Sequence, residues 1–163
     1  MATKDFLVAA VVMTTEDGED GPSLSEMIAI AKGAGAGPII AVVPRGFTAP
    51  AGGRTVHVAP RAPRIAAIRA GLSQLTNTPL QYAILLPRRP LSANAIAMQA
   101  MMRAARETPA PMMALAGVPL GDSPIVIGRE SWLDMITIGE RGLDAVARRR
   151  GLFEVQWDSP NAG

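Results

Sequence analysis

Apolar residues recur along the chain in two alternating patterns. Continuous apolar runs rich in valine and isoleucine predict strands that are buried on both faces, and apolar residues spaced three and four apart predict helices that bury one side. We expect strands at Phe6–Met13, Pro38–Val43, Thr55–Val58, Gln81–Leu86, Met112–Ala116, Ile125–Ile127 and Leu152–Trp157. We expect helices at Ser23–Gly33, Arg64–Leu75, Ser92–Arg106, Ser131–Ile136 and Gly142–Arg150.

This alternation predicts an α/β fold with three layers, in which helices cover both faces of a mostly parallel, Rossmann-like sheet. A chain of 163 residues suits one domain with a real core, so we treat residues 1–163 as a single domain. Ligands of such sheets bind outside the carboxyl ends of the strands, near a topological switch point. The connections that follow the strands, where we expect a site, are Thr14–Pro22, Pro44–Gly53, Ala59–Pro63 and Pro87–Leu91.

Several kinds of chemistry lack the residues they need. The chain has no cysteine, which excludes disulfides, thiolate metal sites and thiol nucleophiles. Its one histidine, His57, has no acidic neighbour, and we favour a structural role for it. The glycines of Gly33–Gly37 follow an expected helix instead of opening one, which favours a helix end over a phosphate loop. No stretch reaches the roughly 18 apolar residues of a membrane span, and no signal peptide is evident, so we expect a cytoplasmic protein.

The net charge is only +2, but the charges are unevenly distributed. The segment Glu16–Asp20 carries four carboxylates, whereas residues 27 to 106 contain no Asp or Glu. The cations of that second span are Lys32, Arg45, Arg54, Arg61, Arg64, Arg69, Arg88, Arg89, Arg103 and Arg106. We favour solvated faces that neutralise one another within the fold or an oligomer, and the alternative is a basic half that binds an anion or acidic partner. Few aromatic residues and no binding-module motif argue against nucleic acid.

Four stretches together resemble one family. They are "GPSLSEMIAIAKGAGAGPIIAVV", "APRIAAIRAGLSQL", "YAILLPRRPLSANAIAMQAMM" and "DSPIVIGRESWLDMITIGERGLDAVARRR". In this order they are similar to the NTP transferases of molybdenum-cofactor maturation, the molybdopterin guanylyl- and cytidylyltransferases with a MobA-like NTP transferase domain. The resemblance covers nearly the whole chain and implies a Rossmann-like nucleotidyltransferase fold. In working members it implies a Gly- and Arg-containing loop that holds the triphosphate after the first strand, and an aspartate that holds Mg²⁺ after the fourth.

The sequence departs from that family pattern where the chemistry would occur. The loop after the first expected strand is short, lacks the Gly-Arg-Met pattern and carries Glu16–Asp20, whose charges would repel a nucleotide. Arg88 stands where the resemblance implies the metal-binding aspartate, and an arginine does not ligate a cation. The family's Gly-His-Pro stretch corresponds to Gly121–Pro124 here, and "WDSP" resembles an acidic motif near the end of the family domain. Asp122 and Asp158 are therefore the weak alternatives for a metal ligand.

Our leading hypothesis is a protein that keeps the nucleotidyltransferase scaffold and has lost metal-dependent transfer. It would have no catalytic residues, no metal and no cofactor, and would act through binding, as a subunit of a complex with a protein partner or as a homo-oligomer. Without a ligand, we favour pairing of Arg88 with Glu16–Asp20 at the carboxyl edge of the sheet.

Two further hypotheses stay open. In the first, the chain is an active CTP or GTP transferase that uses Mg²⁺, with Asp122, Asp158 or the acidic loop as metal ligand and Arg88 on a phosphate. In the second, it is a regulatory module that binds a small anion and involves neither a membrane nor nucleic acid. The candidate pocket residues for that anion are Arg88, Arg89, Arg61, Arg64, Thr14 and Thr15.

Overall fold

The computed structural model describes residues 8–13, 24–46, 54–62, 64–78, 80–86, 95–107, 110–118, 123–138 and 142–157. Strands and helices alternate along the chain as the apolar pattern predicts. In chain order they are β1 (Val8–Met13), α1 (Leu24–Gly33), β2 (Ile39–Pro44), β3 (Arg54–Val58), α2 (Arg64–Ser73), β4 (Tyr82–Leu86), α3 (Ala95–Glu107), β5 (Met112–Leu115), β6 (Ile125–Gly128), α4 (Arg129–Ile138), α5 (Gly142–Arg150) and β7 (Phe153–Val155).

The strands form one sheet in the order β3-β2-β1-β4-β6-β5-β7. β6 runs antiparallel to both of its neighbours, β4 and β5, and the other pairs are parallel. The reversal of β6 follows from its short connection to β5, because a parallel neighbour would need a crossover of a dozen or more residues. The expected mostly parallel sheet is confirmed, with one reversed strand.

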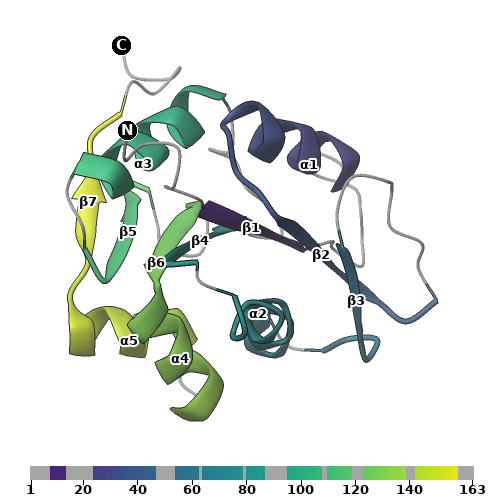
Figure 1. Cartoon of the computed structure of the whole chain (residues 1–163). Coiled ribbons are helices and arrows are strands. Elements are labelled where there is room, and N and C mark those ends of the chain that lie inside the picture. The colour runs from purple at the N-terminus through teal and green to yellow at the C-terminus, as the bar shows by residue number, and fades with distance from the viewer. Residues whose placement is uncertain are drawn as a thin grey trace.

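Helices cover both faces of the sheet, with α1 and α3 on one face and α2, α4 and α5 on the other (Figure 1). β2 shows why both faces are apolar. Ile39 and Ala41 pack into the core beneath α1 and α3, whereas Ile40 and Val42 pack into the core beneath α2 and α4. Successive side chains of a strand point to opposite faces, so a strand covered on both sides must be apolar throughout. The three-layer α/β fold predicted from the sequence is confirmed.

Most element boundaries differ from the predicted ones by one to three residues, and the differences at α2, α4 and β7 have a visible structural reason. α2 ends at Ser73, two residues before the expected end, although Leu75 is still buried in the turn that follows. α4 begins at Arg129, two residues early, because β6 passes directly into this helix and the backbone N–H of Arg129 donates to Gln81 O at 2.9 Å. β7 is confined to Phe153–Val155, since those residues alone pair with β5. None of the helices within the described ranges is long and apolar enough to cross a membrane.

β1 lies in the interior of the sheet, between β2 and β4. From β1 the chain moves outward on one side to β2 and β3, and it then returns to the other side of β1 with β4. The order of the strands therefore reverses between β1 and β4. Their carboxyl ends form the topological switch point, where α/β sheets of this kind bind ligands.

Candidate functional site

The switch point lies between β1 and β4, the two strands that directly precede the leading predicted site residues. Val12 near the end of β1 pairs in register with Leu86 at the end of β4. The chain then continues from β1 into Thr14 and Thr15, and from β4 into Arg88 and Arg89. These four residues lie outside the described ranges, as do Glu16–Asp20. The strands are thus adjacent as expected, and contact between the two sets of side chains stays a prediction.

Arg61 is the one predicted pocket arginine whose side chain is described. It is exposed in the loop after β3 and adopts a left-handed backbone conformation with φ 64°. β2 and β1 lie between β3 and β4, so three strand spacings, roughly 14 Å, separate Arg61's strand from the strand preceding Arg88. Arg64 begins α2, and its side chain is outside the described set. A single pocket containing all four arginines would therefore have to extend across half of the sheet edge.

The sequence neighbours of two predicted metal ligands border the carboxyl end of β5. Ser123, which follows Asp122, is fully buried; its Oγ accepts a hydrogen bond from Leu115 N at 3.0 Å and donates one to Pro124 O at 2.6 Å. Trp157, which precedes Asp158, donates from Nε1 to Ala116 O at 3.2 Å. Asp122 and Asp158 themselves lie outside the described ranges. Their immediate neighbours in sequence are both anchored at the end of the same strand.

The family resemblance implies Mg²⁺ at this edge, which requires clustered oxygen ligands. In the described part of the chain, no group of three His, Cys, Asp or Glu residues could hold a metal ion. The sequence from residue 27 to 106 contains no carboxylate, so the segments that follow β2, β3 and β4 have none to contribute. His57 lies exposed on β3 and pairs with Val43 through the backbone. The donors at the ends of these three strands do not fit a magnesium site.

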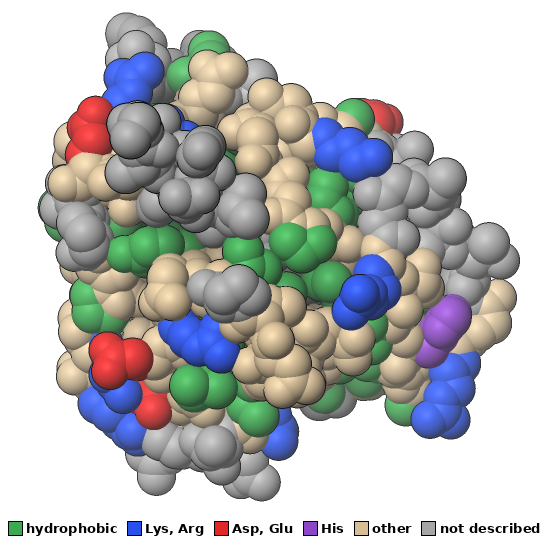
Figure 2. Space-filling view, in the orientation of Figure 1, with side chains coloured by type: hydrophobic (Ala, Val, Ile, Leu, Met, Phe, Trp, Pro, Cys, Tyr) green, Lys and Arg blue, Asp and Glu red, His purple; other side chains and the backbone are tan. Residues whose placement is uncertain are grey.

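The charged surface also bears on the anion hypothesis. On the face shown in Figure 2, the Lys and Arg side chains of the described residues lie in separate spots instead of one continuous patch. Acidic side chains lie beside the cations over α4 and α5, where Arg150 is paired with Asp134 and Glu130. This distribution is the one expected for solvated, mutually neutralising surface charges.

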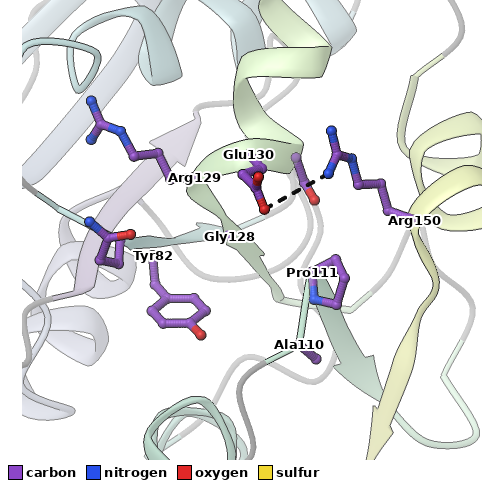
Figure 3. Close-up of a pocket in the computed structure, with 9 residues that line it drawn as sticks. Tyr82, Ala110, Pro111, Gly128, Arg129, Glu130 and Arg150 are labelled. Carbon is purple, nitrogen blue, oxygen red and sulfur yellow. Dashed lines mark ion pairs between the residues drawn. The ribbon is translucent and has the colours of Figure 1, made fainter.

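A cavity of about 370 Å³ opens at the opposite edge of the sheet, where β4 and β5 begin and β6 ends (Figure 3). Its lining includes Tyr82, Pro111, Gly128, Ser131 and Arg150. Burial raises the pKa of the Tyr82 hydroxyl, so the phenol is neutral at physiological pH. Sequence reasoning missed this cavity, because it places ligands at the carboxyl edge. The available signal was the absence of a loop between β6, which ends at Gly128, and α4, which begins at Arg129.

Arg129, the first residue of α4, is bonded to the turn after α2. Its guanidinium donates to three backbone carbonyls in the turn after α2: Thr76 O at 2.7 Å, Thr78 O at 2.6 Å and Leu80 O at 2.9 Å. The same group lies 5.5 Å from the centre of the buried Trp132 ring. Carbonyls left without helical partners at a chain turn need donors, and a planar guanidinium supplies several at once. Arg129 therefore joins α4 to the turn before β4 and is a structural residue.

A second charged network joins α5 to α4. Arg150 Nε donates to Asp134 Oδ2 at 2.7 Å, and Arg150 Nη1 lies 3.9 Å from Glu130 Oε2. Arg149 adds a longer contact of 3.9 Å to the same Asp134 oxygen. The hydrogen bond from Arg150 lowers the pKa of Asp134, and the charges of Arg150 and Arg149 act in the same direction. Asp134 thus stays ionised and fixes the orientation of the Arg150 guanidinium.

Several solved structures share this fold. No protein-family model and no curated protein sequence matches the chain. The Rv0371c protein of Mycobacterium tuberculosis superposes with a TM-score of 0.71 at 14% identity, covering 94% of this chain and 90% of that one. The 2-C-methyl-D-erythritol 4-phosphate cytidylyltransferase of Thermus thermophilus gives 0.63 at 13% identity, covering 94% and 89%. The CMP:2-keto-3-deoxy-manno-octonic acid synthetase gives 0.57 at 11% identity, covering 91% and 90%.

These identities are low, and what they establish is the fold. The chain has a nucleotidyltransferase-like, Rossmann-like fold over nearly its whole length. This agrees with the nucleotidyltransferase fold implied by the sequence resemblance. The agreement concerns the fold and does not extend to the molybdenum-cofactor family itself.

Proposed function

We propose that this chain is a non-catalytic member of the nucleotidyltransferase fold, derived from the molybdenum-cofactor NTP transferases, that acts as a binding subunit of a complex. The observation that carries the proposal is the in-register pairing of Val12 with Leu86 at the switch point. In sequence, Thr14 and Arg88 are each the second residue beyond this pair, so an acidic segment follows one strand and a cationic segment follows its neighbour. Nucleotidyl transfer requires the opposite arrangement of charge.

The acidic segment after β1 and the cationic segment after β4 both disfavour the same ligand, a triphosphate with its bound metal. A triphosphate is held by cations and backbone N–H groups, and its metal bridges the phosphates to carboxylates. The carboxylates of Glu16–Asp20 disfavour the triphosphate, and Arg88 disfavours the metal by charge repulsion and by its lack of a lone pair for coordination. Pairing between the two segments would neutralise both without a ligand. Loss of both halves of the metal–triphosphate unit supports a role in binding instead of transfer.

The catalytic part of the proposal is tested by isothermal titration with CTP, GTP and ATP, each with Mg²⁺ and with Mn²⁺, followed by a pyrophosphate-release assay. We expect no metal-dependent binding in the micromolar range and no pyrophosphate. Metal-dependent micromolar binding together with pyrophosphate release would overturn it. The subunit part is tested by native purification from the source cells, with size-exclusion chromatography and mass spectrometry of what co-elutes. We expect a stoichiometric protein partner or a homo-oligomer, and a bare monomer at cellular concentration would contradict that.

A second candidate function is an active transferase with a rearranged site. Ser123 and Trp157 are both anchored at the end of β5, which supports a common location for the neighbouring Asp122 and Asp158. Rv0371c has also been solved in complex with manganese, and the octonic acid synthetase in complex with CTP, so the fold accommodates both ligands in other proteins. In this reading the two aspartates hold the metal and Arg88 contacts a phosphate.

This second candidate predicts that Asp122→Asn, Asp158→Asn and Arg88→Ala each abolish turnover. Asp144→Asn, which changes an exposed carboxylate on α5, serves as the matched control and should keep full turnover. Wild-type turnover in Arg88→Ala would end the phosphate role of that arginine. Turnover that survives both aspartate changes would place the metal elsewhere.

A further inference from the structure

The cavity at the amino edge of the sheet lies at the opposite ends of the strands from the switch point, so it is a separate place on the molecule. Its volume of about 370 Å³ is that of a site for a small molecule. Its walls combine the start of β4, the residues just before β5, the end of β6, the first turn of α4 and the last residue of α5. The strand and helix ends among these walls hold that part of the site in place before a ligand arrives.

One wall of the cavity is apolar. The Tyr82 ring, Ala110 and Pro111 lie along it (Figure 3). Gly128 leaves open the space in front of them, since a methyl group there would meet Pro111 O at 3.5 Å and Tyr82 Cε1 at 3.8 Å. Both distances are ordinary van der Waals contacts. An alanine at this position would therefore fill part of the cavity without distorting the backbone.

The other wall is polar and carries a pre-oriented cation. Arg150 extends from α5 toward the first turn of α4, where Glu130 faces it (Figure 3). Its bond to Asp134 uses the Nε donor, and a guanidinium has four more N–H groups on its two Nη atoms. The Glu130 contact at 3.9 Å is too long for a hydrogen bond, and the Glu130 side chain is 86% exposed. The Nη groups are thus available to a bidentate anion.

Ser131 also lines the cavity and supplies an unsatisfied polar group. The residue is 1% exposed, and its Oγ has no hydrogen-bond partner, although buried hydroxyls almost always find one. It lies in the first turn of α4, where free N–H groups and the helix dipole favour an anion. Arg129 does not compete for such an anion, because its guanidinium is bound to three carbonyls.

We propose that this cavity is a binding site for a small organic monocarboxylate. The carboxylate lies against Arg150 and Ser131 at the start of α4, and a short apolar or aromatic body packs on Tyr82 and Pro111. The negative charge of Glu130 at the rim disfavours ligands with several charges, which separates this site from one for nucleoside triphosphates. Occupancy here does not depend on nucleotide binding at the switch point.

The test is a titration of ¹⁵N-labelled full-length protein with benzoate, followed by two-dimensional NMR. We expect saturable shifts of the backbone amides of Gly128 and Ser131, and a dissociation constant of about 1 mM or below. Arg150→Gln should weaken binding about tenfold, because it removes the charge-assisted bonds. Glu130→Gln should tighten binding several-fold, because it removes the competing carboxylate. Arg148→Gln, which deletes an exposed charge from the same helix, is the matched control and should leave the affinity unchanged.

Two further variants keep the proposal falsifiable if Arg150→Gln fails to fold. Gly128→Ala narrows the cavity and Ser131→Ala removes only the unpartnered hydroxyl, and both should weaken benzoate binding in a protein of normal stability. Absence of shifts at these amides up to about 10 mM benzoate would overturn the proposal. So would equal weakening by Arg148→Gln and Arg150→Gln, which would show a general charge effect. Equally tight binding of inorganic phosphate or of benzyl alcohol would contradict a site that selects both a carboxylate and an apolar body.

Discussion

The two edges of the sheet contain arginines in opposite situations. At the amino edge, Arg129 donates to three backbone carbonyls and Arg150 is bonded to Asp134, so both guanidinium groups have defined partners. At the carboxyl edge, Arg88 and Arg89 follow β4 beside the strand that leads into an acidic segment. The amino edge shows that an arginine at a strand end is frequently a structural donor. An arginine becomes evidence of function only when its partners leave part of it unused, as they do for Arg150.

The arginines at the two edges represent two kinds of electrostatic interaction. A guanidinium that satisfies partly buried carbonyls is difficult to replace, because its removal leaves acceptors without donors. A cation that faces acidic side chains across solvent is screened by salt and contributes little. The two edges should therefore respond differently to the same arginine substitution.

Replacement of Arg129 should have the largest effect. Arg129→Met keeps an unbranched apolar stem but removes the guanidinium, which leaves three carbonyls without their donor and removes the contact of that cation with the Trp132 ring. We expect a loss of about 3 kcal/mol in the free energy of unfolding, measured by urea denaturation. Arg148→Met removes an exposed guanidinium from α5 and should change stability by less than about 0.5 kcal/mol. Equal effects of the two substitutions would show that the carbonyl contacts contribute nothing.

Ser123→Ala tests a buried hydrogen bond at the carboxyl edge, as Arg129→Met does at the amino edge. The substitution removes the acceptor of the Leu115 N–H inside a fully buried site. We expect a loss of about 1 to 2 kcal/mol in the free energy of unfolding, because a buried N–H is left unpaired. Ser73→Ala is the matched control, since the Ser73 hydroxyl bonds to Arg69 O on an exposed helix surface. A stable Ser123→Ala protein would show that the β5–β6 connection is held by other contacts.

Arg88→Ala should have a smaller effect, and one that depends on salt. If Arg88 pairs with the acidic segment at the carboxyl edge, its removal lowers the free energy of unfolding by less than about 1 kcal/mol at low ionic strength. At 1 M salt, where the screening length is about 3 Å, the difference should disappear. A loss comparable to that of Arg129→Met would mean that Arg88 also satisfies buried acceptors. The two edges would then be alike.

The apolar pattern was sufficient to predict the layers and most of the elements. β2 and β4 are apolar at every position or nearly so, because helices cover both of their sides. The direction of β6 could not be predicted from its own residues. A run of four apolar or small residues gives no sign of whether the strand is parallel or antiparallel to its neighbours. The short β5–β6 connection was the signal for an antiparallel strand. The ends of α2 and α4 were missed because a turn and a direct strand-to-helix junction replace the usual loops.

The site was less predictable than the fold. The carbonyl partners of Arg129 are 49 to 53 residues distant in the sequence, so no local pattern could identify them. The cavity depends on Gly128, Ser131 and Arg150, which come together only when α5 packs against α4. At the carboxyl edge, by contrast, the strand order alone identifies the adjacent strands. At that edge the sequence also predicts the charge of the segment that follows each strand.

The ion pair between Asp134 and Arg150 should give the smallest effect and the clearest dependence on pH. Because the folded-state pKa of Asp134 lies below its ordinary value of 3.8, its ionised form stabilises the fold above that pH. The contribution is lost as the pH falls through the lower, folded-state pKa. Asp134→Asn should therefore lower the urea midpoint slightly at pH 7, and its difference from wild type should shrink as the pH falls below 3.8. Glu154→Gln, at an exposed carboxylate on β7, is the control. A difference between Asp134→Asn and wild type that persists undiminished at low pH would show that the residue stabilises through packing, and that Arg150 is oriented by other groups.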